Sequence, residues 1–214
     1  MAAVPTGTLF SLATAFGSNI TVTAASNAST AVCTATAHGL SDGDIIEFTS
    51  GWGRANKRVF RVDNKTTDTF ELEGFNTTDT NFFPAGSGTG TVREITTWQQ
   101  LSKVMNPATS GGDPKNVVYK WVESDVEYSI NDGFTATSMT LEFDDDDTTA
   151  GFTSMRTLTD SQSNTVMKML MRSGAVIYLP VTVALNEMPI LQDGQINRVR
   201  ASFNGNNRPT RYSS

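Results

Sequence analysis

Apolar residues are densest in one stretch toward the C-terminal end, where two different patterns follow each other. Between about 160 and 173 they recur at spacings of one, three and four, which predicts an amphipathic helix. Asp160 or Ser161 can cap its first turn, and Gly174 suits the left-handed position beyond its last turn. Residues 175–185 are apolar on both faces, which predicts a buried strand. The helical stripe consists of Val166, Met167, Leu170 and Met171.

Residues 20–94 show a different pattern, in which short alternating runs are separated by turn-forming residues. Alternation of apolar and polar positions over four to six residues is typical of half-buried strands. Some 75 residues of such strands predict a small β-barrel or sandwich of their own, inserted into a host domain. The runs are 31–35, 44–49, 58–62, 69–73 and 91–95.

The host is residues 95–214, for which we expect a β-sandwich with the helix on its flank. In the run 137–143, Met139, Leu141 and Phe143 share the inward parity. In the run 196–203, the apolar residues again share one parity, and Arg198 and Arg200 take the other. The inward residues of this second run are Val199, Ala201 and Phe203.

One polar row lies between these runs. If residues 117–131 form a single strand, Glu123, Asp125 and Glu127 line one face of it, and the face is exposed to water.

The N-terminal segment, residues 1–19, has little periodicity and two interpretations. It is either a frayed terminus or an arm that becomes ordered only against a neighbouring subunit. Apolar side chains favour the arm, because a plain tail would be more polar. They are Leu9, Phe10, Leu12 and Phe16.

Composition excludes several classes of protein. With 214 residues the chain can bury a hydrophobic core without the help of disulfides or bound metals. Its net charge of −6 disfavours nucleic-acid binding over the whole surface. No run approaches the roughly 20 apolar residues that span a membrane, and the N-terminus lacks the pattern of a secretion signal. A single cysteine is consistent with folding in a reducing cytoplasm.

Candidate chemistry is sparse. His38 is the only histidine, which excludes a multi-histidine metal site, and we expect it to be structural rather than part of a catalytic triad. Cys33 has strand neighbours and is expected to be a buried, unreactive thiol. Asp144–Asp147 is interpreted as a solvated acidic loop, with a calcium ion as the open alternative. The glycines at 86–90 match no phosphate-binding fingerprint, so we expect neither an enzyme nor a cofactor.

The order of elements in the C-terminal half resembles the tail tube (major tail) proteins of long-tailed bacteriophages. The resemblance covers about residues 95–214 plus the N-terminal segment. It rests on a strand pair, an Asp-rich loop, a helix, the strand 175–185, the break Glu187-Met188-Pro189, the strand 195–203 and the closing turn 204–209. It implies a β-sandwich that assembles as hexameric rings, which stack into a tube through which the genome passes. A long loop and the N-terminal arm would reach the next ring.

A second resemblance concerns the insertion. Residues 37–45, continued by 59–62 and 69–72, look like a small β-barrel module found in phage structural proteins and in ubiquitin-activating enzymes. The catalytic regions of those enzymes have no counterpart here. The module would decorate the outside of a tube in the virion tail, assembled in the host cytoplasm, with other tail proteins at the tube ends.

Two expectations follow for residues. DNA carries one negative charge per roughly 1.7 Å, so a conduit wall should avoid cations, and Glu123, Asp125 and Glu127 are predicted to line the lumen.

The alternative function is a carbohydrate- or receptor-binding protein that uses the 20–94 module. Its binding platform would consist of Trp52, Phe82 and Phe83.

Overall fold

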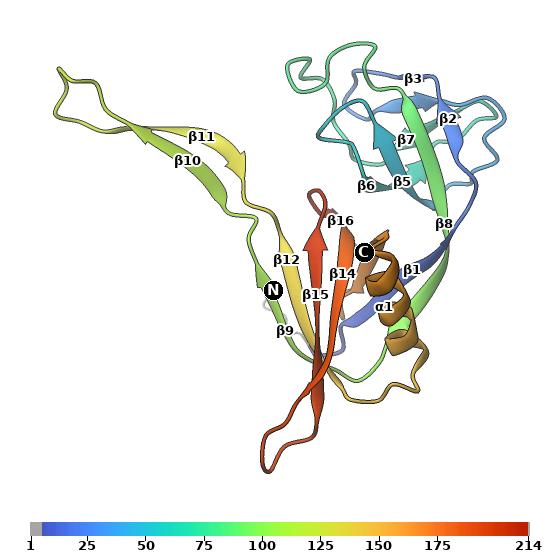
Figure 1. Ribbon diagram of the computed structural model, residues 1–214. Helices are drawn as coiled ribbons and strands as arrows, with labels where there is room; N and C mark the ends of the chain where they lie inside the picture. The colour runs from blue at the N-terminus through green and yellow to red at the C-terminus, as the bar shows by residue number, and fades with distance from the viewer. Residues whose placement is uncertain (1–5, 214) are drawn as a thin grey trace.

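The computed structural model describes residues 6–213, which form a mainly β protein with one helix, as the sequence predicted (Figure 1). Antiparallel neighbours build the main part of a large curled sheet, whose strands we give in spatial order. They are β9 (Val104–Ser110), β12 (Ser138–Asp144), β15 (Arg198–Gly205), β14 (Val176–Ile190), β13 (Asn164–Leu170), β1 (Leu9–Phe16) and β8 (Gly90–Leu101).

Side-chain parity decides which face of this sheet becomes core. In the pair β12–β15, Met139, Leu141 and Phe143 are buried together with the apolar residues of the partner strand, as the alternation predicted. Strand β14 is buried on both faces over residues 178–181, which confirms the buried strand expected there. This core also receives the apolar face of the helix, through Phe152 and Met155.

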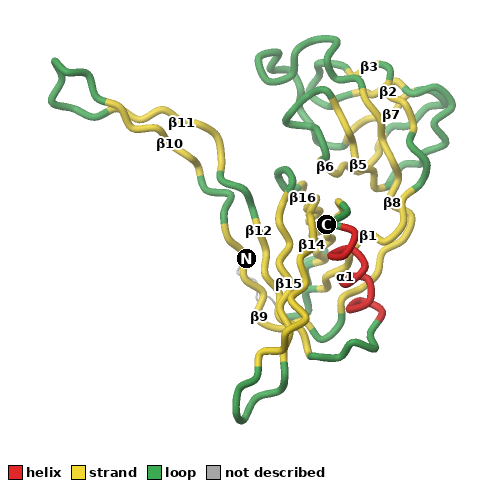
Figure 2. The backbone as a smooth tube through the Cα atoms, in the orientation of Figure 1, coloured by secondary structure: helices red, strands yellow, loops and turns green. Residues whose placement is uncertain are grey.

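The helix itself is not where the sequence predicted it. Residues 164–170 form the central strand β13, and the helix α1 spans Ala150–Ser161, where the side chain of Thr149 caps the N–H of Phe152 (Figure 2). The error has a physical cause. Because β13 lies between two layers, Val166 faces one cluster and Met167 the other, so adjacent residues are both buried. That pattern resembles a helical stripe.

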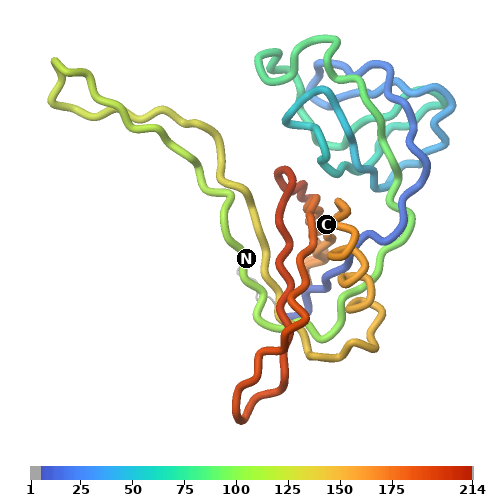
Figure 3. The backbone as a smooth tube through the Cα atoms, viewed as in Figure 1, coloured from blue at the N-terminus to red at the C-terminus, as the bar shows by residue number. Residues whose placement is uncertain are grey.

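The N-terminal segment is ordered within its own chain, which corrects the expectation of an arm that needs a neighbour. Strand β1 pairs with β8 on one side and β13 on the other, so the blue N-terminal strand is in the middle of the sheet (Figure 3). Phe10 and Leu12 are core residues, Phe16 is half-buried under Arg93, and Leu9 is exposed. The part of the predicted arm in residues 1–5 lies outside the described residues.

The inserted segment has its own core, which includes Phe48, Phe60 and Phe70. It is joined to the main sheet through β8, which runs without a break from one to the other, so the expected boundary at 94 falls inside a strand. Its first and last strands pair at Ile20 and Val92. Its strands are β2 (Ile20–Val22), β3 (Ala24–Ala25), β4 (Val32–Thr34), β5 (Ile45–Ser50), β6 (Arg58–Asp63) and β7 (Thr69–Leu72).

A second junction fixes the module against the main sheet. The short C-terminal strand β16 (Thr210–Tyr212) pairs with β14 and lies against β6. There the N–H of Arg61 donates to the hydroxyl of Tyr212, and the amide of Asn207 donates to the carbonyl of Asn56. Apolar packing between Val59, Val166 and Tyr178 fills the space behind these bonds.

Candidate assembly interface

A two-stranded hairpin projects from the molecule on its own. Strands β10 (Pro114–Tyr119) and β11 (Tyr128–Phe134) pair only with each other and form a separate sheet, which extends away from the main sheet (Figure 1). Almost every residue between 113 and 134 is exposed. A lone two-stranded ribbon is marginally stable in water, so its stability depends on contacts beyond its own strands.

One face of this hairpin is apolar and the other is polar. Val117 lies directly opposite Ile130, and Tyr119 lies opposite Tyr128 with the two rings stacked at 5.5 Å. Trp121 adds an edge contact to Tyr119, at 5.6 Å between ring centroids. Residues paired directly across an antiparallel ladder project from the same face, so these side chains form one surface, which we call the apolar hairpin face.

The opposite face of the hairpin carries mainly hydrogen-bonding groups. Asn116 lies opposite Asn131, and Val118 lies opposite Ser129. The apolar face is nevertheless open to solvent, because Val117 is 49% and Ile130 57% exposed. Contiguous apolar surface of this kind marks a site of interaction with another molecule.

Glycines set the angle at which the hairpin leaves the sheet. Strand β9 would run straight into β10, but Gly111 and Gly112 intervene with φ angles of +77° and +82°. A Cβ atom at Gly111 would lie 1.9 Å from the carbonyl oxygen of Ala136, in the connection between β11 and β12. Only glycine fits this bend, which turns the hairpin out of the plane of the sheet.

The carboxylates predicted on a strand face are at the tip of this hairpin instead. Residues 120–127 form the connection between β10 and β11, so Glu123, Asp125 and Glu127 lie on an exposed loop. The single strand assumed for 117–131 is therefore wrong. The alternation of Val122 and Val126 with the acids continued the strand pattern across the turn, and no glycine or proline interrupted it.

The aromatic platform predicted on the module is also incorrect. Trp52 is 1% and Phe83 6% exposed, and the two rings pack edge to face in the module core at 5.3 Å. The indole N–H of Trp52 donates to the carbonyl of Pro84 at 2.8 Å. Phe82 is exposed, with the guanidinium of Arg54 over its ring. One accessible ring does not make a platform.

The face of the main sheet opposite its apolar core is polar, and part of its positive charge is neutralised by an ion pair. Glu142 accepts hydrogen bonds of 2.9 Å from Arg198 and from Arg200, and one of 2.8 Å from Asn106. The bond from Asn106, followed by that from Arg200, holds the pKa of Glu142 below its ordinary value. The two arginines therefore bind an acid of their own sheet rather than the predicted acidic row.

The acidic loop before α1 is held by a lysine. The ammonium of Lys103 lies 3.0 Å from Asp144 and 2.7 Å from Asp146. The hydrogen bond from Lys103, with two more from Thr148, lowers the pKa of Asp146 to about 2. Among residues 6–213, no three His, Cys, Asp or Glu side chains come together as metal ligands.

The remaining reactive groups are structural. The N–H of Leu40 donates to Nδ1 of His38, and Nε2 lies 3.2 Å from the carbonyl of Thr69, so both ring nitrogens are used inside the module. Burial raises the pKa of the Cys33 thiol to about 12, which keeps it protonated and unreactive.

The apolar hairpin face was missed at the level of sequence. Its signal is present in the chain, since Val117 and Tyr119 share a parity, as do Tyr128 and Ile130. The prediction of one strand over 117–131 missed the turn at 120–127, which brings these residues onto the same surface.

Comparison with known proteins supplies the family. Within the part of the chain that the structure describes, no helix combines the length and apolar character that a membrane crossing requires. None of the curated proteins matches this sequence. The model of one family, described as phage tail tube protein, matches residues 50–214, which is most of the chain and includes the hairpin and the strands of the curled sheet from β8 onward. The chain belongs to the phage tail tube protein family.

Proposed function

We propose that this chain is the repeating subunit of a hollow tube, built from stacked sixfold rings in the phage tail, through which DNA passes during ejection. The observation that carries this proposal is the apolar hairpin face, which no part of residues 6–213 covers. Family membership supports a structural role in the virion tail. Assembly in the host cytoplasm is part of the proposal. No bond-making chemistry is proposed.

The partner proposed for the apolar hairpin face is a second copy of this chain, because a tube subunit is surrounded by other copies of itself at high local concentration. Fully burying a Val, Ile or Tyr-sized apolar side chain contributes about 1.5–3 kcal/mol. Val117, Ile130 and Tyr128 are each about half exposed, so burying the rest of each contributes about half of that amount and offsets only part of the loss of freedom that association entails. A projecting hairpin that docks on a different surface of the next copy makes a head-to-tail contact, and such contacts close into rings or extend into stacks.

The wall of the bore is proposed to be the polar face of β12 and β15. It carries Thr140, Ser202 and Glu142 on the side opposite the apolar core, and Glu142 is only 8% exposed there. Cations on such a wall would bind phosphate and retard the DNA, and Glu142 offsets one of the two positive charges of Arg198 and Arg200. Glu123, Asp125 and Glu127, which the sequence predicted for the lumen, lie at the hairpin tip and not on this face.

The module is proposed to decorate the outside of the tube, with other tail proteins at the tube ends. Its junction through Tyr212 and Asn207 fixes it against the C-terminal strand and turn of the main sheet. A carbohydrate- or receptor-binding role has lost two of the three aromatic residues on which it depended, because Trp52 and Phe83 are buried.

Negative-stain electron microscopy of the purified full-length chain tests the proposal. We expect rings or tubes from the natural sequence and dispersed protein from a Val117→Ser, Ile130→Ser variant. Val118→Ser is the matched control, because Val118 is 60% exposed on the opposite face of the same hairpin. Circular dichroism checks that all variants fold. Dispersed protein from the natural sequence at high concentration would refute the proposal.

A further inference from the structure

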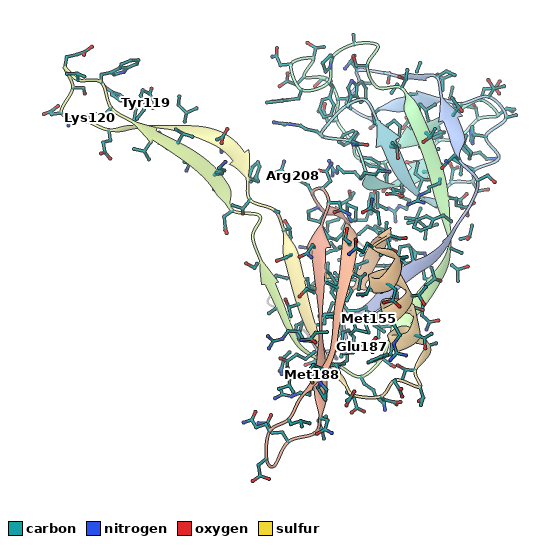
Figure 4. All side chains as sticks on the ribbon, in the orientation of Figure 1. Tyr119, Lys120, Met155, Glu187, Met188 and Arg208 are labelled. Carbon is teal, nitrogen blue, oxygen red and sulfur yellow. The ribbon has the colours of Figure 1, made fainter. Side chains whose placement is uncertain are left out.

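An open groove lies between the base of the hairpin and the module. One part, of about 680 Å³, is lined by Arg54 and Phe82 of the module, by residues 131–134 of the hairpin, and by Arg208 of the turn before β16. A second part, of about 830 Å³, shares Phe134 and Arg208 and continues along the bend at 111–112. Figure 4 shows Arg208 between the hairpin and the module.

This groove is cationic and aromatic. The guanidinium of Arg54 lies 3.2 Å from the ring centroid of Phe82, and that of Arg208 lies 3.9 Å from the centroid of Phe134. Both rings are about half exposed. The acid in the lining, Asp132, is engaged by Lys115 at 3.1 Å. Guanidinium groups held flat against aromatic rings keep their edges free for carboxylates.

The hairpin tip carries the complementary surface. Residues 120–127 contain three carboxylates and one lysine, and Trp121, Val122 and Val126 among them are all more than half exposed. The tip cannot fill the groove of its own chain, because the groove wall is the base of the same hairpin. Tyr119 and Lys120 lie at the far end of the hairpin from Arg208 (Figure 4).

We propose that the acidic tip of one copy docks into the arginine groove of the next copy. Carboxylates of Glu123, Asp125 and Glu127 meet Arg54 and Arg208, while Trp121 and Val122 cover the exposed rings of Phe82 and Phe134. The inference rests on the proposed self-assembly and specifies which surfaces meet. Since tip and groove are different surfaces, the contact is head-to-tail and repeats from copy to copy. The charge pairs set which surfaces recognise each other.

Charge reversal on each side separates this contact from other possibilities. A tip variant carries Glu123→Lys, Asp125→Lys and Glu127→Lys, and a groove variant carries Arg54→Glu and Arg208→Glu. In low salt each variant alone should assemble at a concentration at least about tenfold above that of the natural chain, because like charges face each other. An equimolar mixture should recover assembly, since a basic tip then meets an acidic groove and an acidic tip meets a basic one.

The control is Arg172→Glu, Arg211→Glu, which makes the same change of charge at exposed arginines outside the groove. It should assemble like the natural chain. Sedimentation and negative-stain microscopy provide the readout, and circular dichroism confirms folding. Normal tubes from the tip variant alone, or a mixture that fails to recover, would overturn the tip–groove contact while leaving tube formation intact. Absence of assembly by the natural chain would instead remove the proposed function itself.

Discussion

The backbone N–H of Arg61 donates a 2.8 Å hydrogen bond to the hydroxyl of Tyr212, which joins the module to the last strand of the chain across 151 residues of sequence. The guanidinium of Arg61 also lies 4.5 Å from the centre of the same ring and is bound by Glu73. The orientation of the module thus depends on the C-terminal strand as well as on β8.

Replacing Tyr212 by Phe should weaken this junction. The N–H of Arg61 loses its acceptor in a half-buried position, and we expect a loss of roughly 1–2 kcal/mol in the free energy of unfolding. Urea denaturation followed by fluorescence measures it. Tyr128→Phe is the control, because that tyrosine lies exposed on the hairpin and should change stability by less than about 0.5 kcal/mol. Equal effects of the two variants would contradict the role of the bond.

Alkaline pH should destabilise the fold through two buried acids. Burial raises the pKa of Tyr212 from 10.0 to about 12 and that of Cys33 from 9.0 to about 12. Since each group keeps its proton in the folded state while the unfolded chain releases it, their contributions are complete below pH 9 and disappear as pH rises toward 12. Urea unfolding between pH 8 and 11.5 should show a falling stability. The fall should begin later in Cys33→Ala and be shallower above pH 10 in Tyr212→Phe.

Acid should act on the lysine-bound loop before α1. Hydrogen bonds from Lys103 and Thr148 lower the pKa of Asp146 from 3.8 to about 2. The stabilisation is therefore present above about pH 4 and disappears as pH falls toward 2. In Lys103→Met, we expect the pKa of Asp146 to rise toward its ordinary value, measured by NMR titration of the carboxyl carbon. Lys65→Met, at an exposed lysine of the module, should leave it unchanged.

The bend at the hairpin base should tolerate no side chain. In Gly111→Ala, the new methyl group meets the carbonyl oxygen of Ala136 and the backbone keeps a positive φ, so the connection between β11 and β12 must shift. We expect a redirected hairpin and reduced assembly. Gly194→Ala is the matched control, with a φ of +73° and open space at its Cβ. Assembly by both variants at the natural concentration would show that the hairpin angle has no role.

The sequence by itself determined the β class, the buried strand at 175–185, and the inward faces of β12 and β15, because alternation fixes which side chains share a face. It also predicted that His38 is structural and that Cys33 is a buried thiol. Tertiary structure decided the rest. Strand β13 is buried on both faces, so its sequence lacks the alternation of apolar and polar residues that identifies a strand. The helix was therefore predicted at 160–173, whereas it spans residues 150–161 in the structure.

The same reason applies to the assembly surface. Local pattern could not show that the chain reverses at 120–127, since the turn lacks glycine and proline and continues the alternation. Only the pairing of Val117 with Ile130 brings the apolar residues onto one face and carries the acids to the tip. Likewise Arg54 and Arg208, distant in sequence, line one groove because the module and the C-terminal turn fold against each other. A surface made by distant segments exists only after the chain has folded, and no local period encodes it.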